Sequence, residues 1–304
     1  PTSGSSMFFR NLTLFRFPTS LDFSQLDELL PEAALKPVGP LELSSRGFIS
    51  PFGRGEEALS HRINDAIWLS VGGEDKILPG AVVNDLLQKK LAMIEEKEGR
   101  KPGRKESREL RDEIVQELLP MAFARTSSIL VWLDLEQGRL VLDCASTGKA
   151  DTLVSALVEC LAGLQVSLLN TQVSPQAAMT QWLTGNADEW PAHFAPGREV
   201  ELKSGDEMNS VVKFTRHPLD DEEMKRHIAQ GKLPTQLALD WEGRVSFVLT
   251  EGTQLKKVAF LDGVFEEQAG AEDNGGFDSD VAIATGELAA LITDLTTALG
   301  GELA

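Results

Sequence analysis

The side chains that most often catalyse reactions or bind metals are scattered along the sequence. No H-E-x-x-H or G-x-S-x-G motif occurs, and the cysteines Cys144 and Cys160 lack the paired spacing of zinc ligands. The four histidines stand apart, at His61, His193, His217 and His227. We therefore expect two reduced, buried thiols, no metal site, no cofactor and no catalytic residues.

The segment VLDCASTGKADTL has the outline of a phosphate-binding loop: a strand, a Gly-Lys turn and a helix. Two required residues are missing, because Asp143 stands where the first glycine belongs and Ala150 follows Lys149 in place of serine or threonine. The loop cannot cradle phosphates or ligate magnesium. We expect Ser146 or Thr147 to cap the following helix instead.

Carboxylates are plentiful, and the densest cluster is DDEE, from Asp220 to Glu223. Paired carboxylates can hold the metal of a nuclease, so these residues raise that alternative. Acidic residues are also favoured in the first turn of a helix, where they face the positive end of the macrodipole. We prefer the helix-start interpretation. A second acidic segment, Glu266–Asp280, is expected to be solvated or disordered.

One short stretch departs from the acidic character of the chain. The formal net charge is -18, which argues for solubility and, taken alone, against nucleic acid. The stretch EEKEGRKPGRKESRELR, however, packs seven lysines and arginines around Pro102-Gly103. From Lys89 to Arg111 there are nine basic residues and five glutamates, a local charge of +4. Because charges more than about 10 Å apart are largely screened, a polyanion responds to the patch rather than to the net charge.

Two interpretations of this basic stretch stay open. It could be a solvated turn held by local ion pairs, for example Glu98 near Lys101. It could also contact phosphates through Arg100, Lys101, Arg104 and Lys105. The stretch contains no aromatic residue for base stacking and no motif that reads bases, so the second interpretation implies sequence-independent binding.

Helical periodicity predicts the elements that carry this stretch. Apolar residues recur on one face of each flanking segment: Val83, Leu86, Leu87, Leu91 and Ile94 in the first, and Leu110, Ile114, Leu118 and Leu119 in the second. We expect Ser107 to cap the second helix and Pro120 to end it. Two such helices with a Pro-Gly turn make an αα-hairpin, whose first helix of about 18 residues would be about 27 Å long. The basic stretch then lies at the end of a helical arm.

Two further places could take part in binding. Met121 and Phe123 follow the predicted helix end, and they fit either an ordinary core or an exposed apolar knob that docks on a partner subunit. The run VVKFTRH places Lys213 and Arg216 on a predicted strand. The candidate phosphate contacts are Lys76, Lys89, Arg100, Lys101, Arg104, Lys105, Lys213 and Arg216.

The remaining pattern predicts an α+β fold with two or three subdomains, as the length of 304 residues favours. Strands, helices and loops alternate along the chain. The expected strands are 8–17, 66–73, 198–204, 209–217 and 255–263, the hairpins turn at 136–138 and 242–243, and a loop lies at 47–53. The expected helices are 21–30, 149–164, 174–185, 220–231 and 285–301. No stretch approaches 18 uncharged apolar residues, so no membrane span is expected. No signal peptide is recognised, the opening PTSGSS resembles a cloning remnant before Met7, and a cytoplasmic protein is expected.

Several ordered blocks resemble the RdgC family of recombination-associated proteins. The blocks are KILP at 76–79, LLPMAFAR at 118–125, LDCAS at 142–146, LALDW at 237–241 and TGELAALI at 285–292, followed by LGGE. The resemblance runs from Met7 to Leu303. It implies a nucleoid-associated DNA-binding protein that is not an enzyme. Family members form a ring-shaped homodimer that surrounds duplex DNA without sequence preference. They are thought to limit the access of the RecA recombinase to DNA.

The resemblance also implies an organisation and roles for single residues. The expected parts are a central domain at 7–75 and 121–168, a helical tip at 76–120 and a base domain at 169–304. Phe123, with Met121 beside it, matches the family's tip contact, and Arg100 and Arg216 fall at positions that are basic in the family. Pro102-Gly103 stands where the family member compared with this chain has a denser run of lysines.

Two other classes of function remain in view. An acidic module that imitates DNA could bind the recombinase directly, in which case the basic residues of the turn would be dispensable. A metal-dependent nuclease could use carboxylates such as Asp220 and Glu223. Sequence-independent binding of DNA by a homodimer is the function that we prefer.

Overall fold

The computed structural model describes residues 9–52, 58–161, 163–265 and 277–304. The chain divides into two compact units. Unit 1 consists of Pro1–Leu26, Ser60–Leu69 and Leu130–Ala304, and unit 2 of Asp27–Leu59 and Ser70–Ile129. The expected start at Met7, residue Phe8 of the first predicted strand and most of the acidic segment lie outside the described residues.

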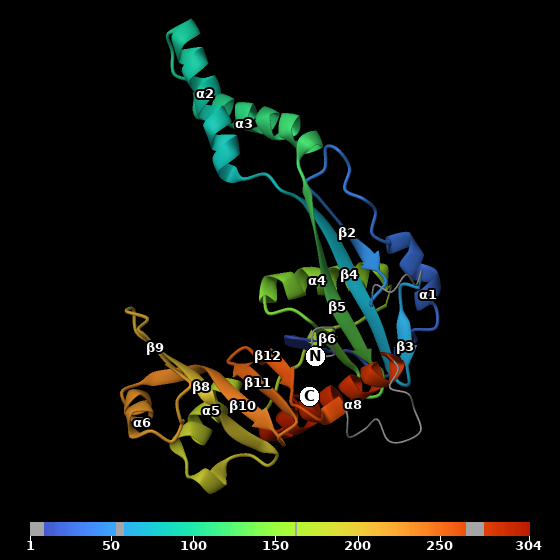
Figure 1. Cartoon of the computed structure of the whole chain (residues 1–304), viewed down its shortest axis with the longest axis vertical. Helices are drawn as coiled ribbons and strands as arrows, with labels where there is room; N and C mark the ends of the chain where they lie inside the picture. The colour runs from blue at the N-terminus through green and yellow to red at the C-terminus, as the bar shows by residue number, and fades with distance from the viewer. Residues whose placement is uncertain (1–8, 53–57, 162, 266–276) are drawn as a thin grey trace. The chain divides into compact units, whose positions relative to one another are not determined.

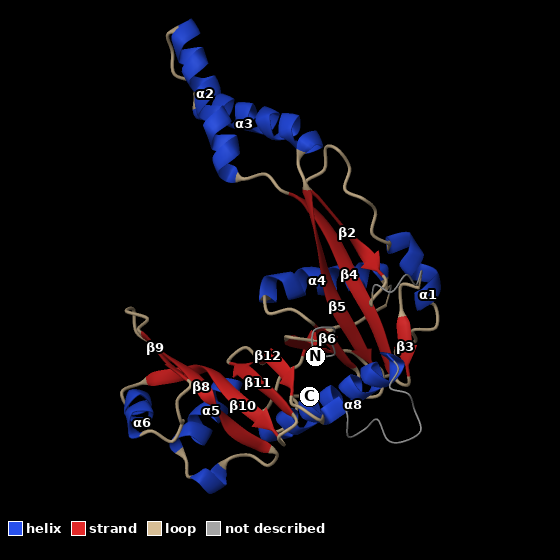
Figure 2. Cartoon of the chain, in the orientation of Figure 1, coloured by secondary structure: helices blue, strands red, loops and turns tan. Residues whose placement is uncertain are grey.

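Helices and strands are mixed along both units (Figures 1 and 2). The α-helices are α1 (Leu26–Leu29), α2 (Gly80–Glu98), α3 (Arg104–Leu118), α4 (Thr147–Cys160), α5 (Pro175–Thr184), α6 (Glu222–Ala229) and α8 (Phe277–Ala298). The strands are β1 (Leu12–Arg16), β2 (Ser44–Ile49), β3 (His61–Ile63), β4 (Ala66–Lys76), β5 (Ala124–Asp134), β6 (Arg139–Leu142), β7 (Ser167–Leu168), β8 (Phe194–Ser204), β9 (Val211–Thr215), β10 (Lys232–Trp241), β11 (Val245–Thr250) and β12 (Gln254–Phe260). Short 3-10 helices occupy Leu30–Ala33, Leu119–Met121 and Ala187–Glu189.

The described strands belong to one large antiparallel sheet, so the predicted α+β class is confirmed. Hydrogen-bonded neighbours follow the order β2-β4-β5-β6-β1-β12-β11-β10-β8-β9, with β3 beside β4 and β7 beside β1. Both predicted hairpins are present, β5 with β6 and β10 with β11. The first turns through Gly138, which has a φ of 65°. A Cβ there would lie 2.4 Å from the Phe17 carbonyl oxygen, so the turn requires glycine.

Unit 1 is built around a dense apolar core. Trp68 and Trp132 stack with ring centroids 6.0 Å apart, and Phe9 lies 5.3 Å from Trp68. In unit 1, β6 is buried along its whole length, as expected for a strand covered on both faces. Helices α5 and α6 pack against β10.

Helix α8 joins the sheet of unit 1 through both apolar and polar contacts. Leu288, Leu291 and Ile292 are fully buried on one face. On the polar side, Trp241 Nε1 donates to Asp294 Oδ2 at 2.8 Å. Among the described helices, α8 alone is long and apolar enough to cross a membrane by length and composition, but half of that stretch is buried in the structure. Its leucine face therefore serves as core.

Three predicted elements differ in the structure. The predicted loop at 47–53 begins inside strand β2, which pairs with β4 so that Gly47 lies opposite Gly72. A Cβ on Gly47 would lie 2.4 Å from Leu35 N, so a close backbone approach explains the glycine. The predicted helix at 21–30 shrinks to α1 and a 3-10 turn that contains Pro31 in its first positions. The last helix begins at Phe277, eight residues before the predicted start.

Candidate nucleic-acid interface

The predicted αα-hairpin is present in unit 2, where α2 and α3 follow β4 and precede β5 (Figure 1). Val83 and Leu87 of α2 pack with Ile114 of α3 in a small buried cluster. The surrounding residues of that cluster are half-buried: Leu86, Leu91, Leu110, Val115 and Leu118. The faces predicted from periodicity are therefore the faces that meet, apart from Ile94 and Leu119, which are not in this cluster.

The turn between the two helices is short and begins with a glycine in the left-handed region. Gly99, with a φ of 64°, ends α2 and donates to the Glu95 carbonyl at 2.9 Å. The second helix begins at Arg104 with Gly103 as its N-cap, so the predicted cap at Ser107 is wrong. Ser107 instead lies inside α3 and donates its backbone N–H to the Gly103 carbonyl. The Pro102-Gly103 break is the hairpin turn, as predicted.

Arg100 closes this turn by joining the two helices. Its guanidinium donates to Glu106 Oε2 at 2.8 Å and to Glu106 Oε1 at 3.1 Å. It also lies 2.8 Å from Glu98 Oε2. These contacts raise the pKa of Arg100, chiefly through the hydrogen bond to Glu106, and the same hydrogen bond lowers the pKa of the Glu106 carboxyl. Glu98 therefore pairs with Arg100 and not with Lys101.

The other basic residues of the turn are exposed. In the part of the chain that the structure describes, no ion pair engages Lys101 or Arg104, and Lys105 lies 4.0 Å from Glu109 at the limit of a contact. Arg104 and Lys105 occupy the first turn of α3, where the helix macrodipole disfavours cations. The same macrodipole favours an anion beside the open backbone N–H groups of that turn. The turn thus presents cations and helix N–H groups together.

The charge of the arm is polarised along its length. From Gly80 to Leu118, nine basic residues balance nine acidic ones, so the arm as a whole is neutral. Basic residues predominate near the turn, whereas Asp112, Glu113 and Glu117 lie toward the other end of α3. The basic character found in the sequence is therefore local to the turn.

Lys76 and Lys89 are in the same unit but have contacts of their own. Lys76 ends β4, and its Nζ donates to the Leu119 carbonyl at 3.0 Å, at the junction of α3 and the 3-10 turn. Lys89 pairs with Asp85 one helical turn earlier, with 2.9 Å between Nζ and Oδ2. Both contacts place the charges away from the four basic residues of the turn.

Lys213 and Arg216 belong to unit 1. Lys213 lies on the edge strand β9 and pairs with Glu201 of β8 at 3.1 Å. That contact and the Thr235 hydroxyl lower the pKa of the Glu201 carboxyl, against the effect of its burial. Arg216 is exposed and follows the end of β9 with a φ of 55°, so the prediction that it lies on the strand is wrong. A left-handed arginine ends the strand at Thr215.

Exposed apolar side chains gather at the base of the arm. Met121 is 73% exposed and Phe123 is 84% exposed, so the core interpretation of these residues is wrong. Backbone hydrogen bonds bring other apolar residues beside them, from Ile77 N to Phe123 O and from Lys76 N to Leu43 O. We call Leu41, Leu43, Ile77, Met121 and Phe123 the apolar cluster.

Three members of the apolar cluster were not predicted from the sequence. Leu41, Leu43 and Ile77 are between 49% and 69% exposed. Leu41 and Leu43 stand in the polar segment PLELSS, a weak signal that they do not belong to a core. Large exposed apolar clusters mark places where a protein meets a partner.

The residues that could have catalysed a reaction are dispersed. Each histidine of the described chain has its own partner: His61 with Asp278, His193 with Glu242, His217 with Asp221 and His227 with Lys232. No group of three or more His, Cys, Asp or Glu side chains placed to hold a metal ion occurs among the described residues. Asp221 caps α6 by accepting from Glu223 N, as the helix-start interpretation predicts. Ser146 caps α4 in the same way.

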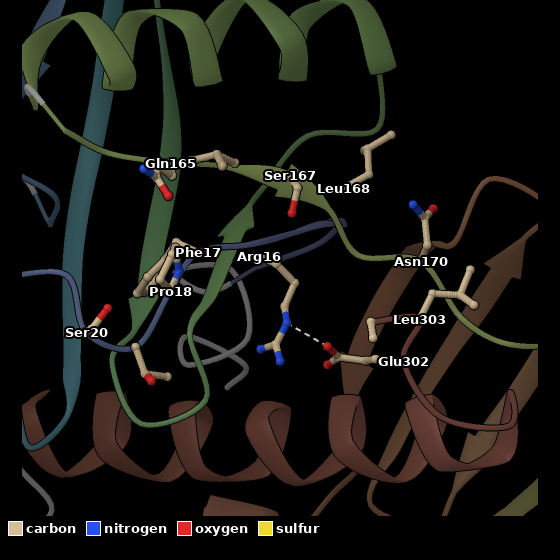
Figure 3. Close-up of a pocket in the computed structure, with 13 residues that line it drawn as sticks. Arg16, Phe17, Pro18, Ser20, Gln165, Ser167, Leu168, Asn170, Glu302 and Leu303 are labelled. Carbon is tan, nitrogen blue, oxygen red and sulfur yellow. Dashed lines mark ion pairs between the residues drawn. The ribbon is translucent and has the colours of Figure 1, made fainter.

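A cavity of about 730 Å³ in unit 1 lies beside β1 and β7. Arg16 points toward Glu302 inside it, with 2.6 Å between Nε and Oε2 (Figure 3). Behind Glu302 lies the buried Arg139, whose pKa is lowered by burial against the opposing effect of Glu302. The two charges of the Arg16–Glu302 pair neutralise one another.

Fold and surfaces together define a mixed α+β protein with a basic helical turn and an exposed apolar cluster. The sequence model of the family described as "Putative exonuclease, RdgC" matches residues 7–302. The chain belongs to the RdgC family.

Similar proteins in other bacteria carry a name that refers to recombination. A "Recombination-associated protein RdgC" of Xanthomonas axonopodis pv. citri is 48% identical over 297 residues, which cover 96% of this chain and 98% of that protein. The protein of the same name in Xanthomonas oryzae pv. oryzae is 47% identical over the same shares. That of Stenotrophomonas maltophilia is 45% identical and covers 93% of this chain and 94% of its own.

Proposed function

We propose that this protein binds duplex DNA without sequence preference, as a homodimeric ring, and that it restricts access of RecA to DNA during recombination. The observation that carries the proposal is the hairpin turn of unit 2. There Lys101 and Arg104 are exposed and have no carboxylate partner among the described residues. The names of the relatives, which refer to recombination, support the same function.

The proposed mechanism is electrostatic and topological. Lysines and arginines of the turn neutralise phosphates and release their counterions, and no base-reading motif restricts the sequence. The apolar cluster joins two copies of the chain through Phe123 and Met121, and a second contact in the base domain closes the ring. The acidic remainder of the chain keeps the DNA-bound protein soluble in the nucleoid of the cytoplasm.

The domain organisation expected from the family completes this proposal. A helical tip at 76–120 carries the turn, a central domain at 7–75 and 121–168 supports it, and a base domain at 169–304 carries Lys213 and Arg216. The dimer then encloses DNA between tip and base.

The test is a DNA-binding titration across salt concentrations, on linear and on covalently closed circular duplexes of one length. If each ring meets about six phosphates, the logarithm of affinity should fall with the logarithm of salt at a slope near -5. A ring must open to leave a closed circle but can slide off a linear end. Dissociation should therefore be much slower from the circle, and a nicked circle is the matched control. Equal rates on both forms, or affinity independent of salt, would contradict the proposal.

The family description raises an exonuclease as a second candidate. We propose no catalytic step, because the carboxylates of the described residues are not grouped as metal ligands. Linear duplex labelled at one end and incubated with the protein and magnesium decides the matter. Release of labelled nucleotides in proportion to protein would replace our proposal with the nuclease.

The acidic character of the chain raises a third candidate, a DNA mimic that binds the recombinase. The two functions differ in what they require of the basic turn. Reversing Arg100, Lys101, Arg104 and Lys105 to glutamate should abolish DNA binding and, with it, inhibition of RecA-promoted strand exchange. Inhibition that survives this change would favour the mimic.

A further inference from the structure

A second cavity of unit 1 is lined by both aromatic and basic side chains. It measures about 690 Å³ and lies between α5, the 3-10 turn at Ala187–Glu189, the start of β8 and the segment that leads into α6. Its volume falls within the range of pockets that hold a small aromatic ligand, roughly 300–1,000 Å³. None of the candidate residues described above lines it, apart from Asp220.

Aromatic side chains form one wall of this cavity. Trp182 and Phe194 are buried and fixed in the core, whereas Trp190 is half-buried. The rings of Trp182 and Trp190 lie 6.1 Å apart, tilted by 34°. The Trp190 side chain is joined by no hydrogen bond to any residue that the structure describes, so its ring is placed by packing alone.

The backbone that carries Trp190 is held in place. Asn186 and Glu189 form a capping box, in which Glu189 Oε2 accepts from Asn186 N at 2.9 Å. Pro191 follows Trp190 directly and restricts the chain there. A preformed aromatic surface of this kind loses little conformational entropy when a flat ligand stacks on it.

Two cations stand at the cavity beside the aromatic wall. Arg198 of β8 is exposed, and no carboxylate among the described residues lies within ion-pair distance of its guanidinium. Its backbone is fixed by the bond from His217 N to Arg198 O, 3.2 Å long. Among the described residues, Lys225 of α6 forms an ion pair with Glu222 alone, at 3.9 Å, and that carboxylate is 82% exposed. Asp220 also lines the cavity, which leaves one net positive charge.

We propose that this cavity binds one unpaired nucleotide of a single-stranded DNA. The base stacks on Trp190, and the flanking phosphate is held by Arg198 and Lys225. An aromatic face beside cations is the combination that single-strand binding proteins use, because every base offers a π-face. A base inside a duplex is stacked on its neighbours and cannot enter the cavity. Single-stranded DNA is therefore a ligand additional to the duplex of the proposed function. Its binding at this cavity does not require the proposed dimeric ring.

The experiment uses the full chain and a short oligothymidylate with a 5′ phosphate, followed by tryptophan fluorescence. Stacking on Trp190 should quench part of the emission, since Trp182, the other tryptophan that lines the cavity, is buried. W190A should bind the strand roughly five- to a hundredfold more weakly, the range for loss of one stacked base. W190F should keep most of the affinity, measured for both variants by anisotropy of a labelled strand. R198Q should weaken binding and reduce its salt dependence, whereas the matched variant R226Q, on the exposed part of α6, should behave as wild type.

Three outcomes would overturn the assignment. The first is wild-type affinity for the strand in both W190A and R198Q; because Arg198 is exposed, R198Q decides the matter even where W190A folds poorly. The second is equal affinity for thymidine monophosphate, which would assign the cavity to free nucleotides. The third is that W190A weakens the binding of a proline-rich peptide but leaves the binding of the DNA strand unchanged. That result would make the cavity a protein-docking site. Duplex binding measured on the same variants separates this proposal from the proposed function: R198Q should leave it unchanged.

Discussion

Arg100 and Glu106 form a two-pronged ion pair across the hairpin turn, with donor–acceptor distances of 2.8 and 3.1 Å. The pair joins the second residue after the end of α2 to the first turn of α3. Arg100 is therefore a structural brace of the turn, and its charge is already neutralised by Glu106 and Glu98. The charge available to a polyanion is that of Lys101, Arg104 and Lys105.

The brace should be visible in the titration of Glu106. The hydrogen bond from Arg100 holds the pKa of this carboxyl below its ordinary value of 4.5. A carboxyl with a depressed pKa stabilises the folded state above its unfolded pKa, and the stabilisation is lost as the pH falls through the folded value. In a carbon-detected NMR titration of glutamate side chains, Glu106 should titrate below 4.5 in the wild type and return toward 4.5 in R100Q.

The matched control for this titration is R108Q, which removes an exposed arginine from the same helix. It should leave Glu106 close to its wild-type behaviour. An equal shift in R100Q and R108Q would mean that general screening, and not the pair, sets the pKa.

DNA binding should depend on the unpaired cations of the turn more than on Arg100. The double variant K101Q/R104Q should reduce the salt slope of duplex binding by about 2, since each lost phosphate contact removes about one unit. R100Q should have a smaller effect, because its charge is shared with two glutamates. Fluorescence anisotropy over a range of salt concentrations measures both slopes.

The control for the turn is K149Q/R226Q, which removes two exposed cations from unit 1 and changes the net charge by the same amount. It should keep the wild-type slope. A loss of slope as large as that of K101Q/R104Q would show that net charge, and not the turn, governs affinity.

Local patterns explain why the helical arm could be predicted from the sequence. Apolar spacing depends on the period of the helix alone, and so it located both helices and the Pro102-Gly103 turn. The start of α3 was misplaced because Gly103 can cap a helix without a side chain, and because the Arg100–Glu106 pair holds the residues that precede Ser107.

Properties that depend on the whole fold could not be predicted in this way. The exposure of Phe123 follows from the strands beside it, and the same apolar residue type would suit a core. Arg216 has a left-handed backbone conformation at the end of β9. Because glycine and asparagine adopt this conformation most readily, an arginine in the sequence gives no signal for it. The cavity around Trp190 combines segments between residues 182 and 225, and no single window of the sequence contains it.

The apolar cluster should control self-association. Phe123 is 84% exposed in the single chain, so F123A should leave the fold intact and change only what that side chain contacts in a partner. If it is an anchor of the dimer, the variant should weaken dimerisation about thirtyfold or more. Sedimentation equilibrium measures the dissociation constant, and circular dichroism checks the fold.

The matched control for F123A is L168A, which truncates a leucine of unit 1 that is 60% exposed. It should dimerise as the wild type does. If F123A dimerises with the wild-type dissociation constant, the apolar cluster is not a contact of the proposed ring. The two chains would then be joined by the base contact alone.

The stability of unit 1 should depend on a paired charge between the sheet and α8. Arg244 donates from Nε to both oxygens of Glu287, at 3.1 and 2.9 Å, and the Glu287 side chain is only 6% exposed. R244M removes this guanidinium from a buried carboxylate, which should cost roughly 3–5 kcal/mol of unfolding free energy. The double variant R244M/E287L replaces the pair by apolar side chains and should recover most of that loss, because no buried charge remains. Urea unfolding, followed by tryptophan fluorescence, measures the unfolding free energy of each variant, with R226Q as an exposed control. A double variant less stable than R244M would contradict this expectation. It would mean that the attraction within the pair exceeds the free energy needed to bury its two charges.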